Sequence, residues 1–76
     1  MKLKQIAANV TEIQIGSVSI MFSYETPVAG WCIDGAFRTD ERYSSTTTKH
    51  INKYLGGSSI GRSVSQSWID NLLVGV

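Results

Sequence analysis

The sequence predicts a small α+β domain in which an antiparallel four-stranded meander is followed by two short helices packed on the sheet. Two observations predict this class. Apolar and polar residues alternate through much of residues 11–39, as in strands, and apolar residues recur at helical spacing within residues 49–73. A chain of 76 residues has room for one modest core, so we expect residues 1–76 to form a single domain.

The first hairpin is predicted from two alternating runs on either side of Gly16-Ser17. Glycine at the first central position of a two-residue connection is typical of a type II′ turn. That turn sets a register in which Ile15 faces Val18 and Ile13 faces Ile20. The large apolar residues of this ribbon should therefore share one face.

The second hairpin is predicted after Pro27, which interrupts the ladder at a corner. Residues 28–33 read as the third strand, and Asp34-Gly35 is a dipeptide typical of a type I′ turn that leads into a fourth strand over residues 36–39. With a two-residue turn, Trp31 and Phe37 fall on opposite faces of the sheet. One of them should cover the core while the other stays partly exposed.

Two helices are predicted in the second half of the chain. A run of capping residues over 43–48 precedes a helix over 49–55, and Gly56-Gly57 ends it. The Gly- and Ser-rich residues 58–62 are predicted to form a loop. Ser63 and Gln66 have the spacing of a capping box. The apolar stripe of this second helix contains Val64, Trp68, Ile69, Leu72 and Leu73.

Composition excludes several classes of function. The formal net charge of +1 provides no overall field for capturing nucleic acid. Cys32 is the one cysteine and cannot form an intramolecular disulfide, which favours a reducing compartment such as the cytoplasm. The sequence contains no run of about 18 uncharged apolar residues, so we expect neither a signal peptide nor a membrane span.

No residue pattern predicts an enzyme. Cys32, His50 and one of Asp34, Asp40 or Asp70 have the residue types of a thiol-protease triad, but Cys32 lies in an apolar strand, where a thiol usually behaves as a small hydrophobe. One cysteine and one histidine supply too few ligands for zinc, and no glycine cluster has the spacing of a nucleotide-binding loop. We therefore expect no catalytic site, no metal and no cofactor.

A partner-binding surface is predicted around the first helix, where basic residues cluster beside hydroxyl side chains. Free N–H groups, hydroxyls and lysines at a helix N-terminus suit a phosphate or a carboxylate. The simpler alternative is that Ser and Thr cap the helix and that the lysines only solvate its outer face. An exposed aromatic ring beside arginines would favour protein binding. The residues predicted to bind a partner are Trp31, Arg38, Arg42, Tyr43, Lys49, His50 and Lys53.

Several segments resemble a family of small proteins of unknown function from tailed bacteriophages. They are Lys4-Gln5-Ile6-Ala7-Ala8-Asn9, Phe22-Ser23-Tyr24-Glu25-Thr26-Pro27-Val28-Ala29, Arg38-Thr39, Thr46-Thr47-Thr48-Lys49-His50-Ile51-Asn52-Lys53 and Gln66-Ser67-Trp68-Ile69-Asp70-Asn71-Leu72. The resemblance covers most of the chain. Tyr54 departs from it, since the family often has Trp at that position, and a bulky ring is retained. The resemblance implies no catalytic residue.

Phage origin would imply an accessory protein that binds a host protein in the bacterial cytoplasm and inhibits or redirects it. Anti-defence factors such as anti-CRISPR proteins are one class of this kind. The first alternative is a small nucleic-acid-binding accessory protein that uses the basic helix face. The second is a homo-oligomer held together by the apolar residues 72–76.

Overall fold

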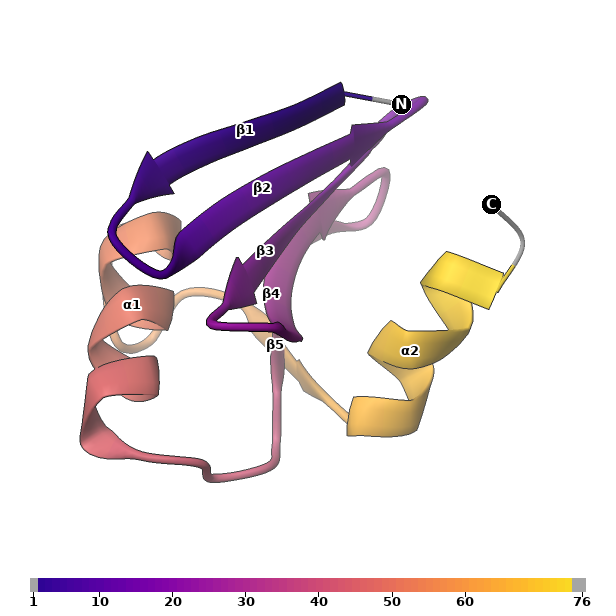
Figure 1. Cartoon of the computed structure of the whole chain (residues 1–76). Helices are drawn as coiled ribbons and strands as arrows, with labels where there is room; N and C mark the ends of the chain where they lie inside the picture. The colour runs from indigo at the N-terminus through magenta and orange to yellow at the C-terminus, as the bar shows by residue number, and fades with distance from the viewer. Residues whose placement is uncertain (1, 75–76) are drawn as a thin grey trace.

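The computed structural model describes residues 2–74, in which a six-stranded sheet separates two helices (Figure 1). The elements are β1 (Lys2–Ala7), β2 (Val10–Ile15), β3 (Val18–Ser23), β4 (Thr26–Cys32), β5 (Gly35–Thr39), α1 (Ser45–Leu55), β6 (Arg62–Val64) and α2 (Gln66–Val74). The strands lie side by side in chain order, with β1 to β5 antiparallel and β6 parallel to β5. The α+β class is confirmed. The predicted four-stranded meander corresponds to β2–β5, and β1 and β6 extend the sheet at its two edges.

The first predicted hairpin is β2–β3, and its register is confirmed. Ile15 pairs with Val18 and Ile13 pairs with Ile20. Gly16 has a φ of 57°, as the first central position of a type II′ turn requires. The turn and the alternation of apolar residues specify the same pairing, which fixes the face on which each side chain lies.

The second predicted hairpin is β4–β5, and its two large aromatic residues lie on opposite faces. Phe37 pairs with Gly30, whereas Trp31 pairs with Ala36. Phe37 is fully buried and Trp31 is 42% exposed. The prediction that one ring covers the core and the other is partly exposed is therefore confirmed.

The predicted type I′ turn between β4 and β5 is wrong. A type I′ turn needs positive φ at both central residues, but within residues 2–74 only Asn9 and Tyr24 among the non-glycine residues have positive φ. The strands are closed by the pair Cys32 and Gly35, and Gly35 has a φ of 108°. The glycine thus follows the turn instead of forming its centre, as in a hairpin with a glycine bulge.

Each helix covers one face of the sheet, so the sheet has a core on both sides (Figure 1). The α1-side core contains Val10, Met21, Val28, Ala29, Ile51 and Leu55. The α2-side core is built on Ile20, Phe37 and Ile69, with Trp68, Leu72 and Leu73 partly buried around them. Successive strand residues point to opposite faces, which is why Ile20 and Met21 can both be fully buried. The prediction that the large apolar residues of β2–β3 share one face is therefore wrong for Met21, which lies in the α1-side core.

The first helix begins earlier than predicted because Ser44 caps it. The Ser44 hydroxyl accepts a hydrogen bond from the Thr47 backbone N–H at 3.1 Å, and Ser44 has extended backbone angles. The predicted end is confirmed, since Gly56 adopts the left-handed conformation with a φ of 94°. Within residues 2–74, neither helix has the length and apolar character needed to cross a membrane.

The second helix begins later than predicted. Val64, which was assigned to the apolar stripe of this helix, belongs to β6, and the predicted capping box of Ser63 and Gln66 is wrong. Ser65 has the capping role, since its hydroxyl accepts from the Trp68 N–H at 3.1 Å. Gln66 instead ties α2 to the sheet, with its amide donating to Pro27 O at 2.7 Å. Of the apolar C-terminal residues, Gly75 and Val76 lie outside the described residues.

Candidate partner-binding site

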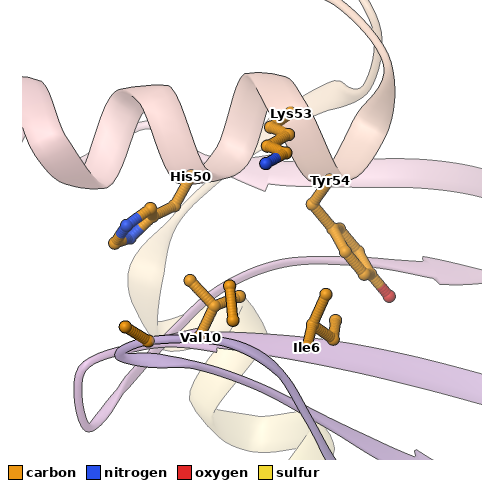
Figure 2. A pocket seen from close by; sticks show the side chains of 7 residues that line it. Ile6, Val10, His50, Lys53 and Tyr54 are labelled. Atoms are coloured by element: carbon orange, nitrogen blue, oxygen red, sulfur yellow. The ribbon is translucent and has the colours of Figure 1, made fainter.

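A mainly apolar pocket of about 520 Å³ opens between the β1–β2 turn and α1. Its floor comes from the β1–β2 hairpin and its roof from α1. Figure 2 shows the side chains of His50, Lys53 and Tyr54 on the helix, across the pocket from Ile6 and Val10. The lining residues are Ile6, Ala7, Ala8, Val10, His50, Lys53 and Tyr54. The volume lies within the range of pockets that hold small molecules or large side chains.

A hydrogen bond from α1 to β2 fixes one wall of the pocket. The Tyr54 hydroxyl donates to Glu12 Oε2 at 2.5 Å. Burial, this hydrogen bond and the charge of the carboxylate together raise the pKa of Tyr54 above its usual value. Tyr54 therefore stays neutral at physiological pH and holds the Glu12 carboxylate as its hydrogen-bond acceptor.

A hydroxyl network beneath α1 fixes His50. Ser23 donates to Thr47 Oγ1 at 3.2 Å, and its hydroxyl lies 2.8 Å from His50 Nδ1. A serine paired with a histidine is also the arrangement of nucleophilic enzymes. Ser23 is only 2% exposed, so its oxygen is closed to a substrate in this structure. This network fixes the position of the His50 imidazole at the side of the pocket.

Tyr24 has an unusual backbone conformation close to this network. Its φ of 59° is rare for a bulky residue, and its N–H donates to Asn9 O at 2.7 Å. This bond ties the β3–β4 turn to the β1–β2 turn. The Tyr24 and His50 ring centroids are 6.0 Å apart. Both turns and α1 thus meet at one end of the sheet, beside the pocket.

The comparisons with known proteins identify a family. A model of DUF8033, a family of unknown function, matches residues 1–71. The chain belongs to the DUF8033 family. No match was found among curated proteins or among solved structures.

Three of the residues predicted to bind a partner lie together on α1 of this DUF8033 protein. His50 and Lys53 line the pocket, and Lys49 is exposed one helical turn before Lys53. Ile51 is buried in the α1-side core, so the two lysines lie on the side of the helix away from Ile51, as their spacing predicted.

The other predicted residues are distributed elsewhere on the DUF8033 protein. Arg38 holds the loop after α1, donating from Nε to Ile60 O at 3.0 Å and from Nη2 to Gly57 O at 2.9 Å. Tyr43 is exposed and donates to Gln66 Oε1 at 2.9 Å. Arg42 is exposed before α1.

Trp31 is not part of the pocket. It pairs with Ser19 on β3, whereas the network residue Ser23 lies at the other end of that strand. At about 3.3 Å per residue, the distance between Ser19 and Ser23 along the strand is about 13 Å. The partly exposed Trp31 therefore belongs to a separate region of the surface.

The β1–β2 hairpin contributes pocket residues that were not among the residues predicted to bind a partner. Ile6, Ala7 and Ala8 lie at the end of β1 and in the turn that follows. The signal that could have found them is Asn9, a residue that accepts positive φ and marks a turn between two strands.

The triad considered from the sequence is not assembled. Cys32 packs with the α2-side core, whereas His50 bonds to Ser23 beneath α1, so the sheet separates them. Among residues 2–74, no group of three or more His, Cys, Asp and Glu residues is placed to hold a metal ion.

Proposed function

We propose that this protein acts by binding another protein through the pocket between the β1–β2 turn and α1. The observation that carries the proposal is the pocket itself, which is open, mainly apolar and flanked by Lys53 and His50. Such a pocket suits a large apolar side chain of a partner. The polar side chains of Lys53 and His50 at its edge would add electrostatic specificity.

The proposed partner is a host protein that this chain inhibits or redirects as a bacteriophage accessory protein in the bacterial cytoplasm. The support is the resemblance of its sequence segments to small phage proteins. Membership in a family of unknown function is compatible with that role. Anti-defence factors, including those that act on CRISPR effectors, are the class we propose first.

Nucleic-acid binding is the second candidate. It is favoured by Lys49 and Lys53, which both lie on the exposed outer face of α1. Arg38, which was predicted to join them, has its guanidinium engaged by two backbone carbonyls. The basic face is therefore smaller than the sequence predicted, and protein binding remains the leading proposal.

An affinity pull-down of the tagged protein from bacterial lysate, with and without nuclease, separates the two candidates. A pocket-filling variant, Ala8→Phe, and a matched control, Ser59→Phe in the exposed loop after α1, make the test specific to the pocket. We expect a nuclease-resistant host protein to be captured by the wild type and by the control but lost with Ala8→Phe. Equal capture by Ala8→Phe, or recovery that nuclease abolishes, would contradict the proposal.

A further inference from the structure

β1 is an outer edge of the sheet and carries exposed apolar side chains. Within residues 2–74 it pairs only with β2. Leu3 is 69% exposed and Ile6 is 45% exposed. The outward backbone groups of an edge strand form a template for another strand, and proteins that recognise extended peptides use such edges.

The edge and the pocket share a side chain. Lys4 pairs with Glu12, which pairs with Met21 of the α1-side core, so Lys4 lies on the α1 side of the sheet. Ile6, two residues further along β1, lines the pocket beneath α1. The β1–β2 ladder is irregular between Gln5 and Ala7, but Lys4 and Ile6 both lie on the α1 side, so a strand added beside β1 would place side chains next to them, within about 5 Å.

The charges on this side favour an acidic partner. Lys4 lies in β1 and Lys53 at the pocket, and these two cations outnumber the Glu12 carboxylate, which pairs with Lys4 and accepts the Tyr54 hydroxyl at 2.5 Å. A second hollow of about 330 Å³, lined by Leu3, Lys4, Glu12 and Gln14, leaves room for another side chain. A second copy of this chain pairing through β1 would bring further lysines to the same edge, and like charges oppose pairing.

We propose that β1 and the pocket together bind an extended segment of the partner protein, which adds as a strand beside β1. On the α1 side this segment carries an acidic residue next to Lys4 and, two positions away, a large apolar residue next to Ile6 that enters the pocket. The assignment rests on the proposed protein-binding function and deepens it by stating the chemistry of the partner segment.

Synthetic peptides test this recognition pattern on the intact protein. Labelled octapeptides with a threonine background vary at two positions, i and i+2, and their affinities are measured by fluorescence anisotropy. The two residues are tested in both orders, Glu-x-Leu and Leu-x-Glu, because the strand could add in either direction. We expect one of these orders to bind tightest. In that order, replacing Glu by Lys or Leu by Ser should weaken binding at least about tenfold, a difference of roughly 1.4 kcal/mol. Equal affinities for the Glu and Lys peptides in that order would overturn the proposed charge preference.

Matched charge variants locate the acidic group. The double variant Lys4→Gln/Lys53→Gln should lose the preference for Glu over Lys in the peptide. The control Arg42→Gln/Lys49→Gln removes the same charge from exposed positions outside the pocket and should keep that preference. Loss of the preference in the control alone would place the acidic group elsewhere and overturn the assignment.

Backbone methylation tests whether the segment adds as a strand. In a strand, alternate N–H groups point toward the neighbouring strand. N-methylating one alternate set of peptide nitrogens should weaken binding at least about tenfold, whereas the other set should tolerate it. Tolerance of both sets would overturn strand addition. If no peptide binds while Ala8→Phe still abolishes partner capture, this inference fails and the proposed function stands; if capture survives Ala8→Phe as well, both fail.

Discussion

Gly30 is a residue at which the sheet leaves no room for a side chain. A Cβ built there would overlap the Ser19 backbone oxygen and lie 2.5 Å from the Phe37 ring. Overpacking of this kind forces backbone shifts. We expect Gly30→Ala to lower the free energy of unfolding by about 2 to 3 kcal/mol, measured by urea denaturation.

Gly57 provides the control for that substitution. A Cβ at Gly57 would make an ordinary contact at 3.4 Å with the flexible end of Ile60, and its φ is not positive. Gly57→Ala should change the free energy of unfolding by no more than about 0.5 kcal/mol. Similar losses in the two variants would mean that the close approach at Gly30 does not decide its effect.

Tyr54 makes stability depend on pH in the alkaline range. Its hydrogen bond to Glu12 and its burial raise its pKa above 10.0 in the folded protein, so the folded state holds a proton that the unfolded state releases. The resulting stabilisation is fully present below pH 10.0 and is lost as pH rises toward the folded pKa.

The free energy of unfolding of the wild type should therefore fall with increasing pH above 10.0, and that of the Tyr54→Phe variant should fall less steeply. Both proteins would be measured by urea denaturation at a series of pH values. Because Tyr43 also has a raised pKa, from burial and from the charges of Glu41 and Asp70, the wild type must be compared with Tyr54→Phe at each pH. Identical slopes would show that Tyr54 does not carry the effect.

The elements that the sequence predicted well are those with two agreeing local signals. The β2–β3 hairpin combined an alternating pattern with Gly16, and both specified the observed register. β1 lacked such agreement, because Leu3 and Ile6 are three positions apart and point to opposite faces. β6 has three residues and pairs with β5, although α1 separates the two strands in the sequence. No local pattern reveals such a pairing.

For the candidate site too, local signals in the sequence found only part of the pocket lining. His50 and Lys53 were predicted because the helix that presents them has its own caps and periodicity. The floor of the pocket could not be predicted, since Ile6 and Ala8 meet α1 only after the sheet has formed. Arg38 was assigned to the surface, whereas tertiary contacts gave its guanidinium two backbone acceptors. Local patterns do not report contacts between distant segments.

At the scale of the whole molecule, few cations are placed to meet a nucleic acid. The chain has 7 basic and 6 acidic residues. Arg38 is engaged by backbone carbonyls, and Arg62 lies over the Trp68 ring at 5.3 Å from its centroid. The basic surface around α1 is therefore left with Arg42, Lys49 and Lys53, all of them exposed.

The small number of exposed cations around α1 limits the salt dependence of any binding to DNA through this face. Each neutralised phosphate contributes about −0.9 to the slope of log K against log salt, so three cations give a slope no steeper than about −2.7. Fluorescence anisotropy of a labelled duplex over a salt series measures it, and Lys49→Glu/Lys53→Glu should flatten the slope to about −0.9 or abolish binding. A steeper slope, or one that the double variant leaves unchanged, would require cations outside this face and would place the nucleic-acid contact on another surface of the domain.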